Sequence, residues 1–306
     1  MTTDIADRSA APAATSFGVK LAEAARAQRS ALCVGLDPLP ERLPAGVGTG
    51  GAGAARFCTA IIDATRDLAC AYKVNLGFFL AFGREGIDAL DRVRAAIPAS
   101  IPIILDCKVG DIDNTAAAYA RGWFDAFGFD ALTVNPYLGE DSVAPFLSYA
   151  DKGVFILCKT SNAGSGDVQD LDIRSASGET EPLFLTIARR VAAWAERYPA
   201  TIGLVVGATY PAQLAAVRDI CPGHPILLPG IGAQDGDLGA AVRAGVDTNG
   251  ENLLVSASRS IIYASGEADF AEAARLAAIE IRDAINRSRL AIDRMIVTPT
   301  GGPDGA

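Results

Sequence analysis

Short apolar segments with the composition of β-strands alternate with segments of helical period along most of this chain. Eight such apolar segments occur, at residues 31–36, 70–74, 101–105, 131–134, 153–157, 202–206, 225–228 and 252–255. Segments with a helical pattern lie between most of them, at residues 54–68, 86–96, 116–127, 183–197 and 211–220. An eightfold alternation of strand and helix predicts an α/β fold, a parallel (β/α)8 TIM barrel.

The length of the chain agrees with one barrel domain. The chain has 306 residues, and single α/β barrels commonly need about 250. The alternative is a doubly wound open sheet, which would need fewer strands and typically an early Gly-x-Gly-x-x-Gly turn. The glycine-rich residues 46–53 follow a proline-containing loop instead, and we expect a flexible connector there. We therefore expect a flexible arm at 1–16, the barrel at 17–295 and a disordered tail at 296–306.

Composition and charge exclude several functional classes. No run of eighteen apolar residues occurs, so we expect no membrane-spanning segment. A formal charge of −9 argues against a nucleic-acid surface, and any anionic ligand must meet local donors. The six cysteines occur singly and are expected to be reduced thiols of a cytoplasmic protein. The only histidine, His224, precedes a proline in a turn, which gives little support to multi-histidine zinc sites or a Ser-His-Asp triad.

The end of the third predicted strand is the most informative site for chemistry. An apolar run ends there in Asp106 and Lys108, and Asp111 follows beyond Gly110. Side chains alternate along a strand, so Asp106 and Lys108 should point the same way, about 7 Å apart along the backbone. Nearby carboxylates raise the pKa of a lysine, which would keep Lys108 protonated until it gives up its proton. A salt bridge at a strand end is the structural alternative, and this motif alone leaves it open.

Other polar residues follow the remaining strands, and the carboxyl ends of all strands in a barrel meet at one face. Lys73 ends an apolar segment, where an unpaired ammonium is costly to bury, so we expect Asp37 and Asp106 beside it. A glycine-rich turn at 229–234 and Arg259 after the last strand together predict a phosphate site.

Two predicted loops are longer than ordinary barrel connections. They span residues 37–53 and 160–181, and the second is rich in Ser, Gly, Asn and Asp. Long polar loops at the carboxyl ends of barrel strands hold ligands or close over them. We therefore expect residues 160–181 to form a lid.

Five motifs, taken in order, resemble the orotidine 5′-phosphate decarboxylase family, and in particular its longer bacterial subfamily, type 2. The segment Asp-x-Lys-x-x-Asp-Ile at 106–112 is similar to the catalytic signature of that family. Similar matches are Cys-Val-Gly-Leu-Asp-Pro at 33–38, Tyr-Lys-Val-Asn-Leu-Gly-Phe-Phe at 72–79, Asn-Pro-Tyr-Leu-Gly at 135–139 and Pro-Gly-Ile-Gly-Ala-Gln at 229–234. The resemblance covers residues 30–264. Val109 stands where that subfamily often has Arg, but this position is not one of the charged ones.

This resemblance implies a carboxy-lyase that converts orotidine 5′-phosphate to UMP in pyrimidine biosynthesis, without metal or cofactor. It implies a catalytic tetrad, with Lys108 as the proton donor to C6 of the ring, formed by Lys73, Asp106, Lys108 and Asp111. It also implies substrate-binding residues, which are Asp37, Asn75, Thr115, Ser161, Gln234 and Arg259. By the same resemblance the ribose would be held by Asp37 and Lys73, the pyrimidine by Ser161, and the phosphate by Gln234 and Arg259. Asp111 and Thr115 would reach into a neighbouring subunit, which implies a homodimer with shared active sites.

Two other functions stay open. The first is a Mg²⁺-dependent sugar-phosphate decarboxylase of the same suprafamily, similar to 3-keto-L-gulonate 6-phosphate decarboxylase. It shares the Asp-x-Lys-x-x-Asp pattern but carries an acid where this chain has Lys73, whose charge would repel a metal. The second is a non-catalytic barrel that binds a nucleotide, for which a complete set of two lysines and two acids has no evident use.

Overall fold

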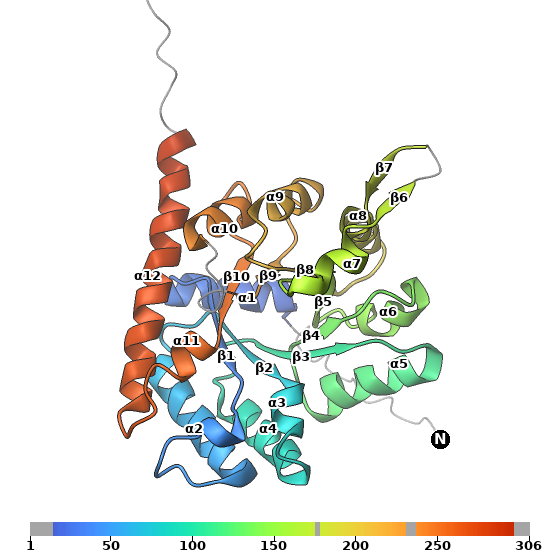
Figure 1. Ribbon diagram of the computed structural model, residues 1–306. Helices are drawn as coiled ribbons and strands as arrows, with labels where there is room; N and C mark the ends of the chain where they lie inside the picture. The colour runs from blue at the N-terminus through green and yellow to red at the C-terminus, as the bar shows by residue number, and fades with distance from the viewer. Residues whose placement is uncertain (1–14, 175–177, 231–236, 297–306) are drawn as a thin grey trace, which may run out of the picture.

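Eight parallel strands close into a barrel in the computed structural model, which describes residues 15–174, 178–230 and 237–296. Around the barrel the strands follow the order β1, β10, β9, β8, β5, β4, β3, β2 (Figure 1). Their bounds are β1 Leu32–Leu36, β2 Ala71–Asn75, β3 Ile103–Val109, β4 Ala131–Val134, β5 Gly153–Lys159, β8 Thr201–Val206, β9 Ile226–Leu228 and β10 Leu253–Ala257. Each predicted strand overlaps one of these, so the (β/α)8 barrel is confirmed.

Helices surround the barrel (Figure 1). The longer ones are α2 Gly50–Thr65, α4 Arg84–Ala96, α5 Asp113–Ala120, α6 Glu140–Leu147, α8 Leu183–Ala195, α9 Pro211–Ile220, α10 Leu238–Gly245 and α12 Phe270–Ile296. Short helices follow β2, β5 and β10, namely α3 Leu76–Leu80, α7 Gly166–Gln169 and α11 Arg259–Ile262. A π-helical turn at Arg121–Ala126 extends α5. No helix within the described residues is long and apolar enough to cross a membrane.

Helix α1, Phe17–Gln28, lies across the amino-terminal end of the barrel and closes it. Phe17 is buried and meets Phe155 edge to face, with the ring centroids 5.8 Å apart. Both rings belong to an apolar cluster inside the barrel that also contains Cys33, Ile104 and Leu254. Because side chains fill this end, the opening for a ligand is left to the carboxyl ends of the strands.

The expected lid contains secondary structure of its own. A 3₁₀ turn at Ala163–Ser165 and helix α7 follow β5, and β6 Asp172–Arg174 pairs antiparallel with β7 Thr180–Pro182. This pair projects from the barrel beside α8 (Figure 1). A role as a lid stays a prediction. Of the expected terminal segments, residues 1–14 and 297–306 lie outside the described residues.

The glycine-rich segment 46–53 is not simply a flexible connector, as expected from the sequence, because α2 begins at Gly50. Gly51 and Gly53 are buried in the first turn of that helix. A Cβ added to Gly51 would collide with the backbone carbonyl of Glu85 in α4. The glycines therefore allow α2 to approach α4 closely, a requirement that comes from packing between two helices.

Replacing Gly51 with alanine should destabilise the fold by about 1–3 kcal/mol, because the extra methyl group overpacks the contact between α2 and α4. Thermal unfolding measures the effect as a lower Tm. Gly266→Ala is the matched control, since an added Cβ there would meet nothing within 4 Å. Equal Tm values for the two variants would show that α2 can move away from α4 without cost.

Candidate active site

Four charged side chains meet at the carboxyl ends of β1, β2 and β3. The Nζ atom of Lys73 lies 3.4 Å from Asp106 Oδ2 and 3.9 Å from Asp37 Oδ1. The Nζ atom of Lys108 lies 2.6 Å from Asp106 Oδ1. Positive and negative groups thus alternate across the mouth of the barrel, and the predicted placement of Lys73 beside both acids is confirmed.

The four side chains of this cluster differ in how deeply they are buried. The side chains of Asp37, Lys73 and Asp106 are 10%, 6% and 12% exposed, whereas Lys108 is 46% exposed. Burial alone would lower the pKa of Lys73, but the charges of Asp37 and then Asp106 outweigh it and raise that pKa. Burial likewise acts to raise the pKa of Asp106, but the two lysines outweigh it and leave that pKa lowered. Lys73 and Asp106 therefore stay ionised near neutral pH, and Lys108 is the ammonium open to a ligand.

The backbone at Lys108 is unusual. Its φ is 47°, in the left-handed region that a residue with a side chain rarely occupies. The register between β3 and β4 also shifts between Leu105 and Val109, which marks a bulge. Asp106 and Lys108 do meet, as expected, but through this bulge rather than through regular strand alternation. Strained backbone of this kind is concentrated at functional sites.

Two polar neighbours orient Asp106. The hydroxyl of Thr133, in β4, donates to Asp106 Oδ1 at 2.9 Å and accepts from the backbone N–H of Lys108 at 2.9 Å. Asn75 Nδ2 donates to Asp106 Oδ2 at 3.3 Å, while its Oδ1 accepts from Gly77 N and caps α3. Sequence analysis missed Thr133. The only available signal was a polar residue inside an otherwise apolar strand.

Asp37 is buried, which excludes the solvated turn acid that an Asp-Pro pair usually indicates. Its Oδ1 accepts from the backbone N–H of Asn75 at 3.2 Å and so ties β1 to β2 at the mouth.

Asp111 and Thr115 lie apart from this cluster. The Asp111 carboxylate accepts a hydrogen bond from the backbone N–H of Ile112 at 2.8 Å, and its contacts among the described residues include none of the four clustered groups. Thr115 is exposed on α5, where it lines a groove of about 310 Å³. One chain therefore assembles three members of the predicted tetrad and leaves the fourth outside.

Ser161 and Arg259, two further predicted substrate-binding residues, follow strands at the mouth of the barrel. Ser161 follows β5 and is half-buried beside the end of β9, where a Cβ on Gly230 would lie 3.6 Å from its Oγ. Arg259 is exposed and begins α11 after β10. Gln234 lies outside the described residues.

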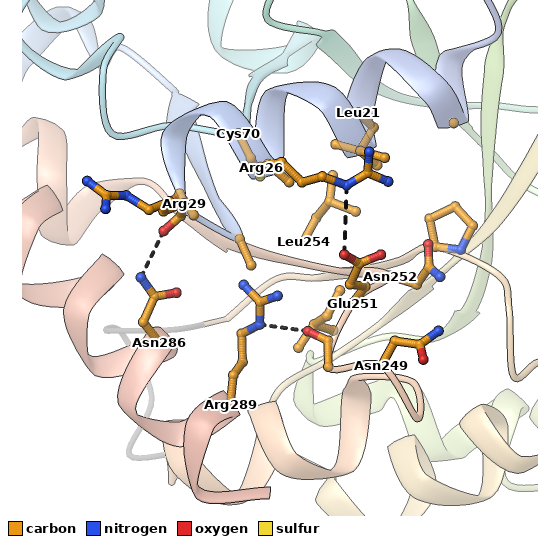
Figure 2. Close-up of a pocket in the computed structure, with 18 of the residues that line it drawn as sticks. Leu21, Arg26, Arg29, Cys70, Asn249, Glu251, Asn252, Leu254, Asn286 and Arg289 are labelled. Atoms are coloured by element: carbon orange, nitrogen blue, oxygen red, sulfur yellow. Dashed lines mark hydrogen bonds and ion pairs between the residues drawn. The ribbon is translucent and has the colours of Figure 1, made fainter. Parts of the chain in front are cut away.

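A cavity of about 720 Å³ lies at the other end of the barrel, between α1 and α12 (Figure 2). Arg26, Arg29 and Arg289 line it, and Arg26 faces Glu251 at 4.0 Å. None of the predicted site residues lines this cavity. The candidate active site is therefore the charged cluster at the carboxyl ends of the strands.

Comparison with known protein families identifies the family of the chain. Residues 30–275 match the model of the orotidine 5′-phosphate decarboxylase / HUMPS family. The chain belongs to this family. The matched region contains all eight barrel strands and every residue of the charged cluster.

Relatives in this family are similar over almost their whole length. The orotidine 5′-phosphate decarboxylase of Thermomicrobium roseum is 53% identical over 274 residues, which cover 90% of this chain and 96% of that protein. The orotidine 5′-phosphate decarboxylase of Roseiflexus castenholzii is 50% identical over 278 residues, covering 90% of this chain and 100% of that protein.

Solved structures in the family share the fold. The OMP decarboxylase of Leishmania donovani superposes with a TM-score of 0.78 at 40% identity, covering 90% of this chain and 99% of that one. The UMP synthase of Leishmania donovani gives a TM-score of 0.80 at 42% identity, covering 90% of this chain and 57% of that one.

The cluster offers a metal ion a poor environment. Among the described residues no group of three or more His, Cys, Asp and Glu side chains is arranged to hold one. Asp37 and Asp106, the two buried carboxylates of the site, share the ammonium of Lys73 instead. Within this family the set of donors therefore fits a reaction driven by lysine and carboxylate charges.

Proposed function

We propose that this protein decarboxylates orotidine 5′-phosphate to UMP, with release of CO₂, in pyrimidine biosynthesis. The observation that carries the proposal is the half-exposed Lys108 ammonium held 2.6 Å from the buried carboxylate of Asp106 at the barrel mouth. The names of the relatives at 53% and 50% identity support it. Adding orotidine 5′-phosphate and following its ultraviolet absorbance tests it directly, and an unchanged spectrum over long incubation would refute it.

The charges suit the chemistry of this decarboxylation. Cleavage of the bond between C6 and the carboxylate leaves an electron pair in the plane of the ring, where the carbonyl groups cannot delocalise it. The site must therefore stabilise a localised negative charge electrostatically. The ammonium of Lys108 faces the mouth and would donate its proton to C6, completing UMP. Lys108 would then recover a proton from solvent.

Asp106 and Lys73 would have different tasks. Asp106 would lie near the departing carboxylate and disfavour the bound substrate relative to the transition state. Lys73 would compensate the two buried acids, and with Asp37 it would hold the ribose hydroxyl groups. Asn75 and Thr133 would keep Asp106 oriented, through the hydrogen bonds of 3.3 Å and 2.9 Å.

The phosphate site would lie between β9 and β10. Gly230, two residues after β9, has a φ of 100°, a conformation that favours a tight turn with exposed backbone N–H groups. Arg259 lies at the start of α11, directly after β10. With Gln234 it would complete the phosphate site. Binding the phosphate far from C6 supplies energy that the reacting centre can use. The pyrimidine would contact Ser161.

Arg259→Ala should lower kcat/KM for orotidine 5′-phosphate by roughly 30- to 1,000-fold, equivalent to about 2–4 kcal/mol, because a charge-assisted phosphate contact is lost. A substrate that lacks the phosphate should be almost indifferent to the change. Steady-state kinetics with both substrates give the answer. Equal losses for the two would assign Arg259 a structural role instead.

Turnover should survive exhaustive chelation with EDTA, since Lys73 stands where the Mg²⁺-dependent sugar-phosphate decarboxylase would carry an acid and its charge would repel a metal. The assay compares chelated enzyme with and without added Mg²⁺. Activity that disappears with EDTA and returns with Mg²⁺ would favour the Mg²⁺-dependent sugar-phosphate decarboxylase.

We further propose a homodimer with shared active sites. Asp111 lies outside the cluster of its own chain and beside exposed apolar side chains, of which Ile112 is 49% and Tyr137 82% exposed. Helix α5 packs beside α6, and the groove around Thr115 adds Tyr119 and Trp123 to this face. Apolar exposure of this kind indicates a contact with another chain. Asp111 and Thr115 would then enter the active site of the partner.

A cytoplasmic location agrees with the reduced state of the cysteines. All six are free thiols, and burial raises the pKa of Cys107 to about 11, which makes it unreactive. Reduced, inert thiols are usual for a protein of the cytoplasm.

A further inference from the structure

Lys159, the last residue of β5, is a buried charged group with no part in the cluster at the mouth. Its side chain is 1% exposed, and its Nζ lies 2.7 Å and 2.8 Å from the two carboxylate oxygens of Asp170. Ser165 Oγ lies 3.2 Å from the same ammonium, and the ring of Tyr210 lies 4.8 Å away. The structure turns its ammonium into the loop that follows β5.

A second pair of contacts stands directly beside this ion pair. The backbone N–H of Thr160 donates to Gln169 Oε1 at 2.9 Å, and Gln169 Nε2 donates to Thr160 Oγ1 at 2.8 Å. Residues 159 and 160 are thus joined to residues 169 and 170, and the segment between them forms a closed loop. We call these four side chains the clasp.

Ser161 is the first residue inside the closed loop, and its backbone is tightly surrounded. A Cβ added to Gly207, at the end of β8, would lie 2.8 Å from Ser161 Cα and 2.9 Å from Ser161 N. A Cβ added to Gly230 would lie 3.5 Å from Ser161 Cβ. The ends of β8 and β9 therefore hold Ser161 from one side, while the clasp fixes the chain immediately before it.

We propose that Lys159 is a positioning residue, which through its ion pair with Asp170 sets Ser161 where the pyrimidine of the substrate binds. This inference rests on the proposed decarboxylation. A buried lysine needs a compensating charge, so the chain around Asp170 must stay folded against β5 while Lys159 is charged. The loop is consequently ordered before substrate arrives, and no binding energy is needed to order Ser161.

A double-mutant cycle separates positioning from general stabilisation. Lys159→Met and Ser161→Ala should each lower kcat/KM roughly 10- to 100-fold, since a small misplacement of a binding group is costly. The kcat/KM of the double variant should be within about 2-fold of that of the less active single variant, because Lys159 acts through Ser161. Multiplied losses in the double variant, or an unaffected Lys159→Met enzyme, would overturn the proposal.

Lys20→Met is the matched control. It breaks the pair between Lys20 and Asp130, 2.8 Å apart at the closed end of the barrel. It should lower Tm without changing kcat/KM, and the double variant Lys20→Met/Ser161→Ala should have the same kcat/KM as Ser161→Ala alone. A Lys20 variant that behaves like Lys159→Met would show that any broken ion pair has this effect.

Hydrogen exchange gives a readout that does not depend on turnover. Asp170→Asn, which keeps the shape of the side chain, serves where Lys159→Met fails to fold. Peptides covering residues 160–170 should exchange faster in Asp170→Asn than in wild type, and equally fast in Lys20→Met and wild type. Unchanged exchange in Asp170→Asn would refute the proposal that the clasp orders this loop. A wild-type enzyme that leaves orotidine 5′-phosphate intact would instead refute the proposed function. The exchange result would still show whether the ion pair orders residues 160–170.

Discussion

Lys108→Met is expected to lower kcat by at least about 10³-fold, because it removes both the proposed proton donor and the positive charge that would face C6. The fold should tolerate the change. Lys108 is 46% exposed, and Asp106 keeps Lys73, Asn75 and Thr133 as partners. Single-turnover kinetics measure the chemical step, and circular dichroism verifies the fold.

Binding of the product UMP provides the control for this variant. Its dissociation constant should change far less than kcat, because the proposed phosphate and ribose contacts do not involve Lys108. A kcat within 10-fold of wild type would contradict the role of Lys108 as proton donor. Tight UMP binding together with a normal kcat would make Lys73 the candidate proton donor.

Mixing two inactive variants is expected to restore activity if active sites are shared between subunits. Lys73→Ala and Asp111→Ala homodimers should each be nearly inactive, since every site in them lacks one tetrad member. In a hybrid dimer both changes fall in one site, and the other site is intact. Random reassortment of equal amounts makes about half of the dimers hybrids and restores up to about a quarter of wild-type activity, as two-fold symmetry requires.

Co-refolding the two variants and assaying decarboxylation measures this recovery. Mixing Lys73→Ala with Lys108→Met is the matched control. Both residues belong to the same chain's cluster, so their hybrid contains no intact site. No recovery with Asp111→Ala, despite demonstrated subunit exchange, would mean that each chain builds its own site and that Asp111 is wrongly assigned.

The barrel was predictable from the sequence because burial leaves a periodic signal along the chain. All eight strands overlap the apolar segments, and α9 begins and ends at the predicted residues. The pairing of Lys73 with Asp37 and Asp106 was predictable too. Strand ends gather at one face of a barrel, and a buried ammonium needs acids.

Contacts between segments were not predictable, because they depend on register and on the distance between elements. Thr133 orients Asp106 only because β4 pairs with β3 across a bulge that also gives Lys108 its φ of 47°. Gly51 is required by a carbonyl of another helix, which local sequence does not encode.

The sequence by itself determined which charged residues stand at strand ends, since strand length and period follow from local hydrophobicity. Only the tertiary structure decided where each charge points. It directs Lys73 and Lys108 toward Asp106, while it turns Lys159 away to Asp170. The physical reason is that the direction of a side chain follows from backbone geometry and from its partners, and these partners come from strands and loops that meet only when the barrel closes.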